Sequence, residues 1–341
     1  MKRILVELMA LVLSCALCHS TVADEPVSDV KASIDFVIPG ALRYLEKEAL
    51  SWKAEMGCAS CHHAPMMLWA CETARAKGFP VKESAVAETR AFILDENNAA
   101  HLFPPADAPP ERDGTQIGSI YALLALNAGP GGWEKSPLAN QTRAHFADTQ
   151  REDGSWPPFP SMGRPPILEQ GGASAQLLVA AFAGLPADGV TPETVATVAK
   201  AKTWLARALE KPSHQMEVTN YIAALATDAS PEILAAREAS LRAQQRPDGS
   251  WAQTPDLAGD ALATGQTLYA LGKAGKRLDD LTVARAVVFL ACAQQPDGSW
   301  PMVSRAVVGG PADGSTTPSK NMAPITCMGT GWAVVGLLAV M

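Results

Sequence analysis

The sequence predicts an all-α protein in which six helix pairs close into a double ring, an (α/α)6 toroid. Two repeating patterns indicate this fold. The first is a seven-residue turn motif, Gln-x-x-Asp-Gly-Ser-Trp, and the second is an aromatic residue followed by alanine within apolar segments. Repeats with a period of 20–50 residues are typical of arrays of supersecondary units, because each unit needs its neighbours to bury its apolar face.

The turn motif sets the period of the repeat. Its three copies run from Gln150 to Trp156, from Gln245 to Trp251 and from Gln294 to Trp300. Trp204 falls at the midpoint of the longer gap, so the period is about 48 residues, which is typical of helical pairs. Asp-Gly is turn chemistry, because aspartate accepts from nearby backbone N–H groups and glycine tolerates positive φ. We therefore expect a structural motif with buried tryptophans.

The second pattern marks an apolar helix in each unit. Its copies are Trp69-Ala70, Tyr121-Ala122, Tyr269-Ala270 and Trp332-Ala333, with Val179-Ala180 and Tyr221 in the other two units. The segments between them, such as 41–54, 195–209 and 283–294, have the 3.6-residue period of amphipathic helices. Each unit therefore pairs an outer amphipathic helix with an inner apolar one. An open array needs polar capping units, whereas the last helix here is apolar throughout, which favours a closed ring.

The turn motif resembles the QW-type repeat of squalene–hopene cyclases and related terpenoid cyclases, whose α/α toroid is shared by protein prenyltransferase β-subunits. The resemblance covers residues 36–341 and implies either cyclisation or prenyl transfer. Cyclisation in that family requires an Asp-x-Asp-Asp acid, which this sequence lacks, and the zinc ligands of the transferases find no match. Asp256 and Asp260 remain as candidate catalytic acids, although a solvated loop or a helix N-cap also explains each of them.

Long irregular segments indicate where a cavity should open. Segments 102–113, 157–169, 252–260 and 301–324 each precede an inner helix, so all four emerge at the N-terminal ends of the inner helices. We expect the mouth of a central cavity at that end. Aromatic residues make up only 6% of the chain, which predicts a cavity with few aromatic side chains.

The first 23 residues have the pattern of a secretory signal. Two basic residues precede a mostly apolar run over 4–18, and Thr21-Val22-Ala23 forms a small-residue cleavage site. The pattern predicts an exported protein, periplasmic or secreted, with a linker at 24–35 before the toroid at 36–341. No integral membrane segment is expected after cleavage.

A lipoprotein anchor is the alternative at this end of the chain. Acylation at Cys15 or Cys18 fits less well than cleavage, because Leu13 and Leu17 stand where small residues are normally needed. The formal net charge of −7, with no basic cluster, argues against nucleic acid as a partner. The expected partners are an apolar small molecule or a redox partner protein.

The clearest chemical motif is Cys58-Ala-Ser-Cys61-His62, which has the Cys-x-x-Cys-His spacing of c-type haem attachment. Two thiols would bond the vinyl groups, and His62 would bind the iron. Five cysteines remain after signal cleavage, and an odd number cannot all pair within one chain. The alternatives are a zinc or other metal site, a Cys58–Cys61 redox disulfide, structural cysteines, or no cofactor.

A sixth iron ligand would come from a neighbouring unit of the ring. His101, Met322 and Met328 are the candidates, and an open or water-bound iron is equally consistent with the sequence. His214 occupies the same repeat position as His62, but its unit lies across the ring, so we expect it to be a loop histidine.

Two classes of function follow from these observations. The first hypothesis is an exported toroid that carries haem c in electron transfer or haem-dependent redox chemistry. The alternative is a terpenoid cyclase or prenyltransferase-like enzyme, or a non-catalytic protein that binds an apolar ligand or a protein partner. The ring alone does not decide whether the protein is an enzyme.

Overall fold

The computed structural model describes residues 27–57, 62–95, 114–135, 137–156, 172–185, 187–207, 209, 212–302 and 323–341. Within these ranges the chain forms twelve α-helices and two short 3-10 helices, Trp133–Lys135 and Ala187–Gly189, and no β-strand. The predicted all-α class is confirmed.

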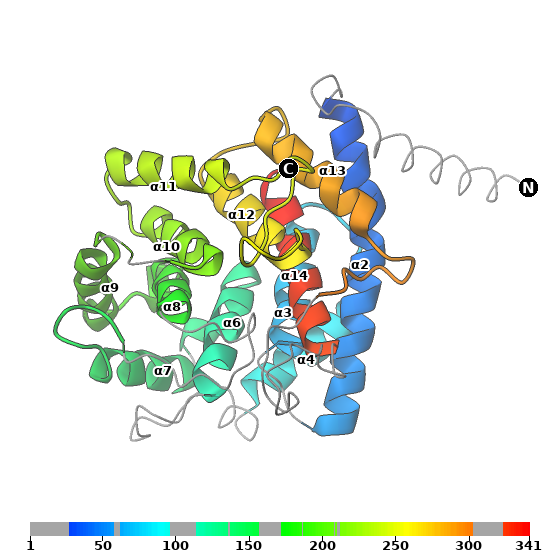
Figure 1. Cartoon of the computed structure of the whole chain (residues 1–341). Helices are drawn as coiled ribbons and strands as arrows, with labels where there is room; N and C mark the ends of the chain where they lie inside the picture. Colours follow the sequence, from blue (N-terminus) through cyan, green and yellow to red (C-terminus); the bar gives the residue numbers. More distant parts are fainter. Residues whose placement is uncertain are drawn as a thin grey trace, which may run out of the picture.

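The α-helices alternate along the chain between an outer and an inner position (Figure 1). The outer helices are α2 (Val27–Met56), α4 (Glu83–Leu94), α7 (Pro137–Asp148), α9 (Pro192–Leu205), α11 (Pro231–Ala243) and α13 (Leu281–Ala293). The inner helices are α3 (Ala64–Ala76), α6 (Gly114–Ala128), α8 (Ala173–Ala183), α10 (His214–Ala226), α12 (Ala261–Lys273) and α14 (Ala323–Ala339). These are the six predicted pairs.

Both rings close on themselves. Each inner helix packs against the next one, and α14 returns to pack against α3. In the outer ring α13 packs against α2. The C-terminal residue also lies beside the first unit, since Lys77 Nζ donates to the Met341 backbone oxygen at 2.8 Å. The predicted contact between the first and last units is confirmed.

The third copy of the turn motif builds this closure. The Trp300 indole N–H donates to the Leu290 carbonyl of its own outer helix, α13, at 2.8 Å. Gln294 Nε2 donates to the Val37 carbonyl of α2 at 2.9 Å. A single turn therefore holds the last outer helix against the first.

The other two copies make the same bonds one and three units earlier. Trp156 and Trp251 donate to Phe146 and Leu241 of their own outer helices at 2.9 and 2.7 Å. Their glutamines, Gln150 and Gln245, donate to Thr197 of α9 and Thr282 of α13 at 3.0 and 2.8 Å. The three tryptophans are 5%, 0% and 2% exposed. The predicted burial of the motif is confirmed.

Local sequence explains where many helices begin. The side chain of the residue before the helix accepts a hydrogen bond from the first turn at Thr191, Ser213, Ser230, Asp260 and Asp280. Such caps satisfy backbone N–H groups that have no partner within the helix.

Small residues bring two of the inner helices unusually close. A Cβ on Gly265 of α12 would lie 2.4 Å from the Trp332 carbonyl oxygen of α14, and one on Gly336 would lie 2.3 Å from the Gly265 carbonyl oxygen. Only glycine allows two backbones to approach this closely, so these positions fix the width of the ring between α12 and α14.

The N-terminal part of the fold differs from the expected division. Helix α2 begins at Val27, inside the stretch 24–35 that we expected to be a linker, because Val30 and Ile34 are buried as part of the same amphipathic helix. The signal segment 1–23, with Cys15 and Cys18, lies outside the described residues. Among the described helices, none has the length and apolar character needed to cross a membrane.

Candidate functional site

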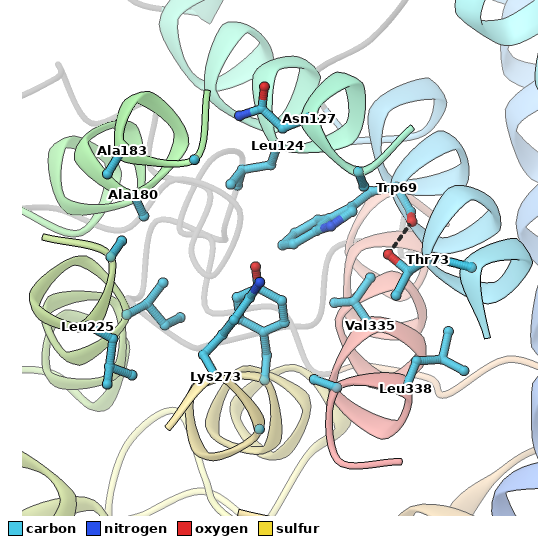
Figure 2. A pocket seen from close by; sticks show the side chains of 18 of the residues that line it. Trp69, Thr73, Leu124, Asn127, Ala180, Ala183, Leu225, Lys273, Val335 and Leu338 are labelled. Atoms are coloured by element: carbon cyan, nitrogen blue, oxygen red, sulfur yellow. Dashed lines mark hydrogen bonds between the residues drawn. The ribbon is translucent and has the colours of Figure 1, made fainter. Parts of the chain in front are cut away.

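The inner ring surrounds a cavity of about 580 Å³. All six inner helices contribute to it, each through its C-terminal half, and Figure 2 shows their side chains directed toward one space. Its lining falls into two layers that lie about one helical turn apart. The layer nearer the middle of the helices, which we call the lower layer, consists of Trp69, Leu124, Ala180, Ile222, Tyr269 and Val335. The layer nearer their C-terminal ends, the upper layer, consists of Thr73, Ala128, Ala183, Ala226, Lys273 and Ala339. The four alanines of the upper layer leave space open, and the longer Lys273 side chain lines the same layer.

Four aromatic side chains from the second sequence pattern cluster beside this cavity, and two of them, Trp69 and Tyr269, line it. The Trp69 ring lies 5.3 Å from Tyr269 and 5.0 Å from Trp332, and all three pack edge to face. The Trp332 indole N–H also donates to the Tyr121 hydroxyl at 3.3 Å. Trp69 and Tyr269 are the two aromatic residues in the described lining of the cavity, which agrees with the expectation of few aromatic side chains there.

Three cationic side chains lie at the rim of the cavity: Lys77, Lys273 and Arg277. Lys273 Nζ lies 5.4 Å from the centre of the Tyr269 ring, and burial of its ammonium among apolar walls lowers its pKa. The Arg277 guanidinium donates to the Gly272 carbonyl at the end of α12. Because helix C-termini carry partial negative charge, these cations stabilise the end of the ring at which six helices terminate.

The described cavity is at the other end of the ring from the predicted mouth, which stays a prediction because most of the segments expected to form it lie outside the described residues. Loop length predicted a mouth at the N-terminal ends of the inner helices, whereas the described cavity is lined by their C-terminal halves. Three of the four long segments lie wholly or mainly outside the described residues.

The two candidate acids lie in and after the loop before α12. Asp260 is the N-cap of this helix, and its carboxylate accepts from the Ala263 and Gln253 backbone N–H groups at 2.9 and 3.3 Å. Burial raises the pKa of Asp260, although these hydrogen bonds act in the opposite direction. Asp256 is exposed in the loop. Asp260 therefore has the capping role that we considered beside catalysis, and neither acid lines the cavity.

His214 is not a loop histidine. It is the first residue of α10 and is buried, with Nε2 3.1 Å from Thr267 Oγ1 of α12 and Nδ1 3.0 Å from Gln244 Oε1. Because both ring nitrogens have partners on neighbouring elements, His214 joins two inner units together.

The histidines of the Cys-x-x-Cys-His motif are buried in front of α3. Their Nδ1 atoms lie 2.5 Å apart, and the His63 ring stacks on Trp52 of α2 at a centroid distance of 4.3 Å. Burial lowers the pKa of His63 to about 4. The Cys327 thiol of α14 lies 3.6 Å from the His62 carbonyl oxygen. The first and last units therefore meet at this histidine pair.

The other residues predicted for a haem site are only partly described. Cys58, Cys61, His101 and Met322 lie outside the described residues, and Met328 is buried within α14. None of the described members lines the cavity.

The described cysteines differ in state. Cys71 and Cys327 are buried free thiols, and burial raises the pKa of Cys71 to about 12. Cys292 is disulfide-bonded, and its partner lies outside the described residues. A raised pKa makes a thiol unreactive at neutral pH, so the two free cysteines serve as small apolar side chains.

No protein-family model matches the sequence, and no curated protein matches it significantly. Solved structures do resemble it. The type II terpene cyclase MstE from Scytonema, in complex with geranylgeranyl dihydroxybenzoate as substrate, aligns with a TM-score of 0.59 over 91% of this chain and 97% of its own, at 14% identity. The apo form of MstE aligns with a TM-score of 0.58 at 15% identity over 90% and 98%. The chain has a terpene cyclase-like fold.

One set of residues in this terpene cyclase-like fold escaped sequence reasoning. One turn below the cavity, on its axis-facing side, α8, α10 and α12 carry Gln176, Thr219 and Gln266, all fully buried. The sequence signal that could have identified these residues is a polar residue within a largely apolar helix. Thr219 Oγ1 lies 2.6 Å from Gln176 Oε1 and 2.7 Å from the Gln215 carbonyl oxygen, and its single proton can be donated to one of them at a time.

Proposed function

We propose that the protein binds an elongated apolar molecule of the isoprenoid type in the central cavity. The observation that carries this proposal is the cavity itself, which is ringed by apolar side chains from six helices and bounded on one side by aromatic rings. Concave apolar sites of this size are typical of small-molecule binding. The likeness to a terpene cyclase supports the choice of ligand class.

The geometry favours binding over cyclisation by this cavity. Protonation of an alkene needs an acid beside the substrate, and the described lining of the cavity contains no carboxyl group. Asp260, the acid whose pKa is raised, caps α12 at the opposite end of that helix. Polyprenyl substrates should therefore be recovered unchanged. A cyclised product that disappears in Asp260→Asn would contradict this assignment and favour the enzyme.

A cavity-filling substitution tests the binding site. Ala180 lies in the lower layer of the cavity wall, so Ala180→Trp should fill the space and weaken farnesol binding at least about tenfold. Titration calorimetry and quenching of tryptophan fluorescence would both measure the affinity. Val195 is 56% exposed on the outer helix α9, and Val195→Trp serves as the matched control, which should bind like the parent. Equal binding by parent and Ala180→Trp would exclude this cavity.

Haem c is the second candidate. It rests on the Cys58-x-x-Cys61-His62 motif and on the exported character predicted from the first 23 residues. The burial of His62, with its Nδ1 held by His63, is compatible with a histidine whose ring is oriented by a neighbour. Haem would supply redox chemistry, and His62 would hold its iron.

One experiment decides the haem candidate. Coexpression with a c-type maturation system should give a haem mass increment that survives denaturation, together with Soret absorbance. Cys58→Ser and Cys61→Ser should lose the doubly attached product. A colourless protein whose peptide map shows Cys58 or Cys61 in a disulfide with Cys292 would exclude attachment, because thioether formation consumes both thiols.

A further inference from the structure

Three buried polar side chains lie about one helical turn beneath the lower layer of the cavity. We call Gln176, Thr219 and Gln266 the axial polar layer. Each belongs to a different inner helix, and each is 0% exposed. A glutamine amide buried without full hydrogen bonding costs free energy, so such groups need an explanation.

Helix geometry places these side chains on the side that faces the axis. Gln266 precedes Tyr269 and Lys273 by three and seven residues, and both of these line the cavity. Gln176 precedes Ala180 and Ala183, which also line it, by four and seven residues. Residues at these spacings share one face of a helix. Both amides therefore lie one turn beyond the cavity-lining residues of α8 and α12, on the same helix faces but outside the lining itself.

The amides are only partly satisfied. Gln176 Oε1 shares the single Thr219 hydroxyl proton with the Gln215 carbonyl oxygen, and Gln176 Nε2 has no hydrogen-bond partner. The Gln266 amide is less satisfied still, since neither its Nε2 nor its Oε1 has a hydrogen-bond partner. Two amide nitrogens and one amide oxygen are thus unpaired on the α8–α12 side of the ring.

The opposite side of the same layer offers almost no polar group. At the corresponding positions α3, α6 and α14 carry Met66, Tyr121 and Trp332, and the Tyr121 hydroxyl already accepts from the Trp332 indole. A polar ligand group at this depth would therefore find its partners on the amide side. The unpaired hydrogen-bonding groups of this layer thus lie on the α8–α12 side only.

We propose that Gln176 and Gln266 bind an uncharged oxygen group, a hydroxyl or a carbonyl, at one end of an isoprenoid whose hydrocarbon chain fills the cavity. This inference rests on the proposed function and specifies its ligand as an oxygenated isoprenoid. The amide N–H groups donate to the ligand oxygen, and Gln266 Oε1 accepts a hydroxyl proton when one is present. Neutral amides suit a neutral partner, because the layer contains no charge to pair with an anion.

Two probes with the same carbon skeleton separate the oxygen from the chain. Farnesol carries a hydroxyl group and farnesene does not. The full-length protein should bind farnesol about tenfold more tightly than farnesene, as expected for a ~1.4 kcal/mol hydrogen-bonding advantage. In Gln266→Leu and Gln176→Leu this preference should fall toward one, while affinity for farnesene stays or improves.

Stability gives a second readout that does not need a ligand. Leucine has nearly the volume of glutamine and removes the unpaired amide, so both variants should melt at higher temperature than the unliganded parent. Thr227→Val is the matched control, because Thr227, the buried C-cap residue of α10, has a satisfied hydroxyl that donates to the Ala223 carbonyl at 2.8 Å. It should leave the farnesol preference unchanged.

The possible failures are distinguishable. If the parent binds both probes equally well, the amides do not recognise the ligand and this inference is overturned while the proposed function stands. If the parent binds neither probe, the proposed function falls and the inference falls with it. A farnesol preference that persists in both leucine variants would place the recognition of the hydroxyl elsewhere.

Discussion

The turns of the outer ring and the axis of the inner ring differ in how strictly they repeat. Each of the three turns uses the same glutamine bond and glycine contact to join one outer helix to the next. Each also uses the same tryptophan bond to its own outer helix. The six residues that face the axis at one level all differ: Met66, Tyr121, Gln176, Thr219, Gln266 and Trp332. The positions that hold neighbouring units together therefore keep the same residues, whereas the positions at this level of the axis do not.

The two regions also differ in how well their polar groups are satisfied. In each turn the glutamine amide, the aspartate and the indole N–H are all hydrogen-bonded. At the axis, two buried glutamines keep unpaired atoms. Stability therefore resides in the repeated turns, and the axis carries a cost that is typical of binding sites.

The largest expected effect comes from removing a turn tryptophan. Trp251 is fully buried and donates to Leu241, so Trp251→Ala should lower the free energy of unfolding by about 3–5 kcal/mol. Denaturant titration would measure it. Trp204 on α9 is only partly buried and outside the motif, and Trp204→Ala should cost less. An equal loss of unfolding free energy in the two variants would show that the turn tryptophans contribute no more to stability than a tryptophan outside the motif.

The next effect isolates the contact that closes the ring. Gly298 has a φ of 91°, and a Cβ there would lie 2.2 Å from the Gly40 carbonyl oxygen of α2. Gly298→Ala should therefore cost about 2–3 kcal/mol, of which the left-handed backbone accounts for ~1 kcal/mol. Gly275 has a φ of 82° with open space around it, so Gly275→Ala measures the backbone share alone. A loss at Gly298 no greater than at Gly275 would contradict a tight closure.

The same contrast explains what the sequence could predict. The outer ring followed from the turn motif, because a repeated spelling fixes both the period and the contacts between units. The cavity did not, because its location depends on where the inner side chains become short, as at Ala183, Ala226 and Ala339. Gln266 could be placed at the axis only once the helix boundaries and its neighbours along α12 were known.

A smaller effect is expected from the glutamine that joins the two ends of the ring. Gln294 Nε2 donates to both Gly298 and Val37, so Gln294→Leu should cost about 1–3 kcal/mol. Hydrogen exchange should become faster in α2 and α13, which this residue links. Gln150→Leu removes the equivalent bond to Thr197 and should instead affect α7 and α9. Faster exchange throughout the molecule in both variants would show that these glutamines do not act only on the two helices that each one links.

The smallest expected effect is the pH response of one turn aspartate. Hydrogen bonds from the Ser155 hydroxyl and backbone N–H, and then Arg207, lower the pKa of Asp153 to about 2. Its charged form therefore contributes stability above pH ~4, its ordinary value, and this contribution disappears as pH falls toward 2. Asp153→Asn keeps the acceptor but removes the charge. Because the carboxylate is exposed, the variant should melt only about 1–2 °C below the parent at pH 6 and at the same temperature at pH 2. A difference that persists at pH 2 would assign the effect to hydrogen-bond geometry rather than to charge.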